Sequence, residues 1–133
     1  MKQPYAWAIV NGFKPVENRP RVGHHRGLLA IHAGKYIPYQ ADCDALAEKH
    51  GITLPDDYEV GRIIGFVNMV DCVTKHKSRW FSGPYGYVLE DAVPCLGPAF
   101  SGQLGFYRTP FPDDFEYPLA IEKFIVGQTQ LLR

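Results

Sequence analysis

The segment QPYAWAIVNGFKPVENR, residues 3–19, decides how the chain begins to fold. Its first half predicts a short helix over residues 3–11, because proline is tolerated in a first helical turn and Asn11-Gly12 is a typical stop. Its second half, residues 14–19, is extended or looped, since flanking prolines exclude a helix. The helix would turn one face toward the core at three- to four-residue spacing, made of Ala6, Trp7 and Val10.

Outward from this segment, short apolar runs between turn residues predict strands. These runs cover residues 27–32, 61–73, 85–89 and 92–96, with a further candidate at 102–107. Gly65, inside the longest run, indicates a bulge or a bend at a barrel corner.

Two more helices are predicted from helical spacing. One covers residues 38–50 and ends at Gly51, and the other covers residues 117–132, with packing that the sequence does not determine. The inward face of the first would consist of Ala41, Cys43, Ala45 and Leu46.

This order of elements is typical of an α+β chain built on a small barrel. A length of 133 residues fits one domain, residues 1–133, with a single core. The regular βαβ alternation and the Gly-rich phosphate loop of a dinucleotide-binding fold are both missing from the sequence.

Formal charge balances at 14 basic and 14 acidic residues, but its distribution is uneven. Residues 1–35 carry six basic residues and one acidic residue, so the first quarter has a net charge of +5. A local cationic face would attract a phosphate within a Debye length of about 8–10 Å. Scattered surface charge is the alternative interpretation.

Three cysteines without a C-x-x-C pair argue against a disulfide framework and against a structural zinc site. We therefore expect neither a metal nor a cofactor, and a reducing, cytoplasmic setting. No apolar run approaches the roughly 20 residues of a membrane span, and no secretory leader is expected.

Four ordered segments resemble the ASCH domain family. The pattern Gly-x-Lys-x-x-Glu-x-Arg, made by Gly12, Lys14, Glu17 and Arg19, follows the aromatic helix as in that family's signature. The later segments RGLLAIHAGK (26–35), SRWFSGPYGYVL (78–89) and VPCLG (93–97) are similar to its first long strand, its Trp-containing loop and its Pro-rich segment. The resemblance covers most of residues 3–107.

The resemblance implies a PUA-like fold, a small twisted β-barrel of about five to six strands flanked by helices. It also implies a cleft beside the Gly-x-Lys-x-x-Glu-x-Arg loop. The family is associated with RNA binding and with transcriptional coactivators, and some members are reported to hydrolyse RNA or modified nucleosides.

The chemistry of the motif residues suits such a cleft. Lys14 is a point charge for a phosphate or a carbonyl, and Arg19 is a planar fork for a phosphate or a base edge. Glu17 could accept hydrogen bonds from a base or act as a general base. In the alternative interpretation, Glu17 and Arg19 form an ion pair that only fixes the loop.

Trp80 lies in a loop and is either a platform on which a base stacks or a plug over one end of the barrel. Tyr5 could belong to the cleft or to the core, and His32 is more simply a core histidine. The other candidate ligand-binding residues are Gly12, Arg21, Arg26, Lys35, Tyr36 and Ser78, for which a solvated loop is the alternative.

Three functions follow from these residues. The first is a binding module for RNA, single-stranded by expectation, or for a nucleotide-like ligand. The second is a hydrolase in which Lys14 and Glu17 are catalytic, although a related amidohydrolase branch resembles Lys-x-x-Thr where this chain has a glutamate. The third is a protein adaptor that docks through residues 111–133.

Overall fold

The computed structural model describes residues 1–99 and 111–121. The predicted strand at residues 102–107 lies outside the described residues, as do residues 122–132 of the predicted C-terminal helix. The described start of that predicted helix is a single 3-10 turn, η1, at Leu119–Ile121.

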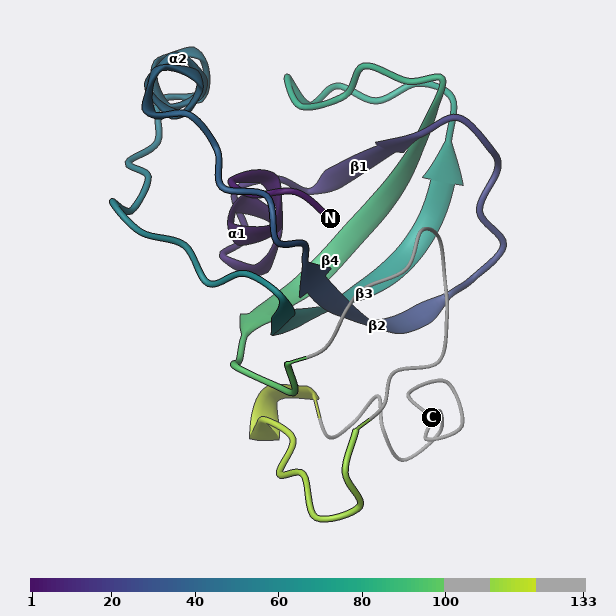
Figure 1. Ribbon diagram of the computed structural model, residues 1–133. Coiled ribbons are helices and arrows are strands. Elements are labelled where there is room, and N and C mark those ends of the chain that lie inside the picture. The colour runs from purple at the N-terminus through teal and green to yellow at the C-terminus, as the bar shows by residue number, and fades with distance from the viewer. Residues whose placement is uncertain (100–110, 122–133) are drawn as a thin grey trace.

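Four antiparallel strands form one curled sheet in the order β1-β4-β3-β2. They are β1 (Val16–Arg19), β2 (Gly27–Ala33), β3 (Arg62–Val73) and β4 (Tyr85–Pro94). Figure 1 shows the long strands β3 and β4 twisting together to give a half-barrel. The α+β prediction is confirmed, with four strands in the described residues instead of five or six.

The first helix, α1 (Tyr5–Val10), packs against β2, β3 and β4 inside the curl of the sheet. Ala6 and Val10 join the core as predicted. The prediction for Trp7 was wrong, because this ring is half-buried and stacks on Phe13 at 5.4 Å between centroids. The smaller residues Ala8 and Ile9 are the buried ones at this part of the helix, and Ile9 joins the core cluster.

Gly65 lies where α1 meets the sheet. The β2–β3 register shifts between Ile31 and His32, opposite Gly65 and Ile63, so the predicted irregularity is present. A Cβ atom on Gly65 would lie 2.6 Å from Val10 Cγ1 and 2.6 Å from the Val93 oxygen. A glycine at this position therefore lets the helix and two strands approach closely.

Residues 85–94 form one strand, where the sequence predicted separate strands at 85–89 and 92–96. Asp91 has φ 53° and lies where the β3–β4 register shifts, between the Phe66–Val93 and Asn68–Glu90 pairs. The bulge inserts an extra residue into β4 and interrupts the alternation of apolar and polar side chains from which strands are predicted. The hydrogen-bonded pairing with β3 nevertheless continues on both sides of the bulge.

The opposite face of the sheet carries a second core cluster, to which residues 111–121 contribute. Phe111 stacks on Phe66 at 5.6 Å between ring centroids, and Ile121 is fully buried. The segment thus covers apolar surface on β3. The rest of the tail that the adaptor hypothesis invokes, residues 122–133, lies outside the described residues.

The second helix, α2 (Gln40–His50), stands beside α1 and away from the sheet (Figure 1). The predicted inward face was largely wrong, because Cys43 is buried, Leu46 is half-buried, and Ala41 and Ala45 are exposed. The physical reason is that α1 already fills the concave face of the sheet. Neither helix in the described part of the chain has the length and apolar character required to cross a membrane.

Replacing Gly65 with alanine is expected to lower the free energy of unfolding by about 3 kcal/mol, because the added methyl group overlaps a helix side chain and a strand carbonyl. Gly34→Ala is the matched control, since a Cβ atom there would meet only the Met1 oxygen at 3.6 Å. The control should change stability by less than about 1 kcal/mol. Urea denaturation of both variants measures this, and equal stabilities would contradict the close packing of α1.

Candidate functional site

The turn after α1 directs Lys14 back beneath the helix. Gly12 has φ 80°, a left-handed conformation that glycine adopts without strain. The amides of Phe13 and Lys14 both donate to the Ala8 carbonyl, at 2.9 and 3.0 Å. These bonds close the helix end and fix the direction in which the chain enters β1.

Lys14 is a buried cation, with 3% of its surface exposed. Its Nζ donates to Glu17 Oε1 and to the Val16 carbonyl, both at 2.8 Å. The other carboxylate oxygen of Glu17 accepts from Arg19 at 3.3 Å. The result is an ion-pair chain, Lys14–Glu17–Arg19, that runs from the interior to the half-exposed Arg19.

The loop of residues 74–84, between β3 and β4, is fastened to β1 by one side chain. Asn18 Nδ2 donates to the Trp80 carbonyl at 2.8 Å, and Asn18 Oδ1 accepts from the amides of Ser82 and Gly83 at 2.8 and 3.2 Å. Ser78 Oγ accepts from the Trp80 amide at 3.1 Å, so this hydroxyl braces the loop. Trp80 is therefore positioned beside the ion-pair chain.

The indole of Trp80 stacks on His50, the last residue of α2. The ring centroids are 3.5 Å apart and the planes differ by 2°. Desolvation, followed by the positive charges of Lys49, Arg79 and Lys14, lowers the pKa of His50 below its ordinary value. The imidazole is thus favoured in its neutral form, and cations from three parts of the chain contribute to this preference.

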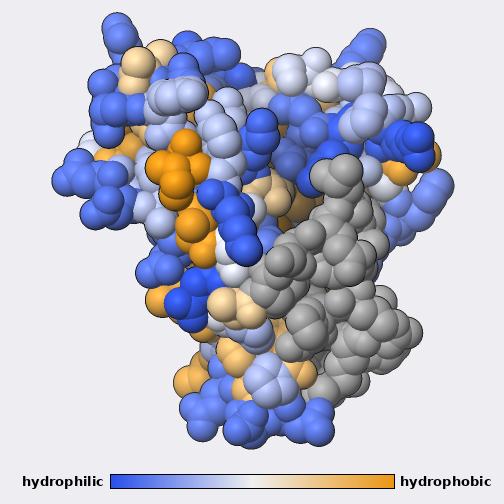
Figure 2. Space-filling view, viewed as in Figure 1, coloured by the Kyte–Doolittle hydropathy of each residue, from blue (hydrophilic) through white to orange (hydrophobic). Residues whose placement is uncertain are grey.

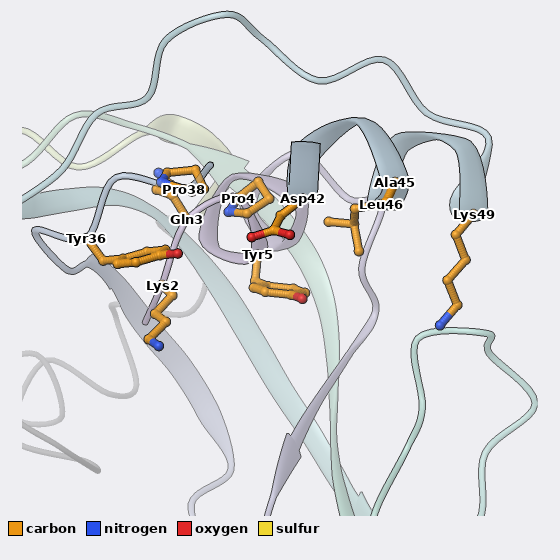
Figure 3. A pocket seen from close by; sticks show the side chains of 10 residues that line it. All are labelled: Lys2, Gln3, Pro4, Tyr5, Tyr36, Pro38, Asp42, Ala45, Leu46 and Lys49. Atoms are coloured by element: carbon orange, nitrogen blue, oxygen red, sulfur yellow. The ribbon is translucent and has the colours of Figure 1, made fainter. Parts of the chain in front are cut away.

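A pocket of about 370 Å³ opens between α1 and α2. In Figure 3, Tyr5 lies beneath Asp42 and Leu46, with Tyr36 and Lys2 on one side and Lys49 on the other. The Nζ of Lys2 is 5.0 Å from the Tyr36 ring centroid. The lining consists of Lys2, Gln3, Pro4, Tyr5, Tyr36, Pro38, Asp42, Ala45, Leu46 and Lys49.

The pocket and the ion-pair chain are neighbours. The Nζ of Lys14 lies 5.9 Å from the centroid of the Tyr5 ring, and Tyr5 lines the pocket. The face drawn in Figure 2 has a hollow near its centre, with hydrophilic and hydrophobic residues around it. Aromatic rings and lysines together line the pocket between the two helices.

The remaining sequence candidates lie elsewhere. Arg26 donates to the carbonyls of Gly23 and His25, at 2.9 and 2.8 Å, and so supports its own loop. Arg21 is exposed and its carbonyl accepts from the Tyr87 hydroxyl. Lys35 is exposed but does not line the pocket, whereas its neighbour Tyr36 does.

The sequence prediction missed Lys2, Asp42, Leu46, Lys49 and His50, and it left Tyr5 open. Four of these residues, Asp42, Leu46, Lys49 and His50, belong to α2. The weakly apolar face of this helix was the signal that could have indicated them, but the sequence prediction assigned that face to the core. Within residues 1–99 and 111–121, no cluster of three or more His, Cys, Asp or Glu side chains could hold a metal ion.

The fold and the site together define a small α+β module with a curled sheet and, between its two helices, a groove lined by tyrosines and lysines. The ASCH domain family matches residues 1–121, and the chain belongs to this family. The ASCH domain is a PUA-like module linked to RNA binding. The resemblance noted in the sequence is therefore confirmed.

Two relatives are named Activating signal cointegrator 1. The protein of Mus musculus is 32% identical over 81 residues, which are 56% of this chain and 14% of that protein. The protein of Homo sapiens is 32% identical over 83 residues, 58% of this chain and 14% of that protein. The matched region is thus a small part of each relative's length.

Substituting Glu17 with glutamine should lower the free energy of unfolding by about 3 kcal/mol, because the buried Lys14 ammonium loses its counter-charge. The matched variant Arg19→Gln removes only the half-exposed ion pair between Arg19 and Glu17. It should lower the free energy of unfolding by less than about 1 kcal/mol. Chemical denaturation compares the two variants. Similar small losses would show that Lys14 does not depend on Glu17.

Proposed function

We propose that this domain binds single-stranded RNA, or a nucleotide at the end of a strand, in the groove between α1 and α2. The observation that carries the proposal is the pocket of about 370 Å³ in which two tyrosines and two lysines meet. The tyrosine rings are available, since Tyr5 is 40% exposed and Tyr36 is 42% exposed.

Unpaired bases bind proteins by stacking on aromatic rings, while nearby cations hold the phosphates. Tyr5 and Tyr36 supply the rings, and Lys2 and Lys49 supply the charges on the two sides of the pocket. Asp42 projects from α2 over Tyr5, where its carboxylate could accept a hydrogen bond from a base amino group.

Lys14 does not line the groove but lies next to Tyr5, which does. Its ammonium is bonded to Glu17 and to the Val16 carbonyl, so we assign it the role of positioning the first helix and the Tyr5 ring, whose centroid is 5.9 Å away. Arg19, at the half-exposed end of the ion-pair chain, is the member that can reach a phosphate. The proposal does not extend to hydrolysis, because the ammonium of Lys14 and the carboxylate of Glu17 are bonded to each other.

Tyr36→Ala is expected to weaken the binding of a short RNA about tenfold or more, since one stacked base contributes about 1–3 kcal/mol. Tyr39→Ala is the matched control, because Tyr39 is 73% exposed and does not line the pocket. Fluorescence anisotropy with a labelled RNA of about eight nucleotides at low salt makes the measurement. Equal losses for both variants would move the binding site away from the groove.

Lys49→Ala should reduce the salt dependence of RNA binding, because one cation–phosphate contact disappears. The slope of log K against log salt is expected to become shallower by about 0.7, the value for one contact with a single strand. Lys35→Ala serves as the control, since Lys35 is exposed outside the pocket lining. An unchanged slope in the Lys49 variant would show that Lys49 of α2 does not contact a phosphate of the RNA.

A further inference from the structure

The stack between Trp80 and His50 joins two parts of the molecule that are anchored very differently. Trp80 belongs to the loop that Asn18 of β1 holds through the Trp80 carbonyl, and Ser78 of the same loop accepts a hydrogen bond from the Trp80 amide. His50 belongs to α2, in which Cys43 is the one fully buried residue. The indole is thus the fixed partner, and the imidazole is the partner that can move at lower cost.

The geometry of this stack is the geometry that a nucleobase adopts on an aromatic side chain. The planes are parallel within 2° and the ring centroids are 3.5 Å apart, so the imidazole covers the indole face directly. Imidazole is also the five-membered half of a purine. A purine placed on the same face would keep the same overlap and extend it with its six-membered ring.

The positive charges near His50 do not stabilise a protonated imidazole. The exposed Lys49 from α2 and Arg79 from the loop disfavour a positive charge on this ring, as does Lys14, which is already paired with Glu17. A neutral imidazole gains nothing from Lys49 and Arg79, whereas a base that carries a phosphate would gain directly. These two exposed cations therefore fit an anionic ligand with a flat ring better than they fit a histidine.

We infer that the face of Trp80 covered by His50 is a stacking subsite for an unpaired nucleobase, and that His50 holds the place of this base until RNA binds. This inference rests on the proposed function and adds a second base position, at the end of the groove where α2 meets the loop. Occupation of the subsite displaces His50, so the RNA must compete with a ring of the protein.

The experiment follows Trp80 fluorescence in a Trp7→Phe background, in which Trp80 is the single tryptophan, since the chain has two. Adenosine 5′-monophosphate and the short RNA are titrated into the parent, into His50→Ala and into His50→Phe. Gln40→Ala is the matched control, because it shortens an exposed, uncharged side chain at the other end of the same helix. Trp80→Ala is measured by anisotropy with the labelled RNA.

His50→Ala is expected to bind both ligands about tenfold more tightly, as it would if the stack is closed about nine-tenths of the time in the parent. His50→Phe retains a covering ring and should bind no more tightly than the parent. Trp80→Ala should bind the RNA about tenfold less tightly. Gln40→Ala should match the parent.

Affinity of His50→Ala that equals or falls below that of the parent would overturn the inference. Binding of RNA that still depends on Tyr36 would then leave the proposed function standing. Failure of the parent and of His50→Ala to bind either ligand at low salt would overturn the subsite and the proposed function together.

Discussion

The burial of one ammonium group determines how this domain is assembled. A charge that is almost fully removed from water must be paired and hydrogen-bonded, and Lys14 satisfies this requirement with Glu17 and the Val16 carbonyl. Because both partners lie in β1, the ion pair ties the end of α1 to the edge strand. Asn18, the next residue of β1, then holds the loop that carries Trp80. The helix, the edge strand and the loop consequently form one connected unit.

This unit forms only one side of the groove. The opposite side is α2, a helix that buries little and stands off the sheet because α1 occupies the concave face. If the groove binds RNA as proposed, one firmly braced wall would keep the stacking rings in place, while the lightly anchored α2 would let the width of the groove change. Tyr5 and Trp80 belong to the braced wall, and Lys49 and His50 belong to α2.

Local signals in the sequence were enough to predict the elements whose boundaries depend on local chemistry. The stop at Gly12 and the irregularity at Gly65 are examples, and both are present. Two errors had non-local causes. The bulge at Asp91 shifts the alternation of side chains along β4 by one residue, but the strand continues beyond it. The weakly apolar face of α2 lies toward the groove rather than the core. Periodicity reports that a face is apolar, but it does not say what covers that face.

The Gly-x-Lys-x-x-Glu-x-Arg motif by itself does not specify a ligand. Gly12 is needed for a left-handed turn, and Glu17 is needed to neutralise Lys14, so these residue types are explained by folding alone. A domain with the same motif would have the same connection between its first helix and its edge strand, whatever ligand it binds. The features that favour a flat, anionic ligand arise from chain-distant pairs, such as the stack of Trp80 on His50, that no local pattern predicts. Differences in ligand between domains with this motif should therefore lie in α2 and in the loop of residues 74–84.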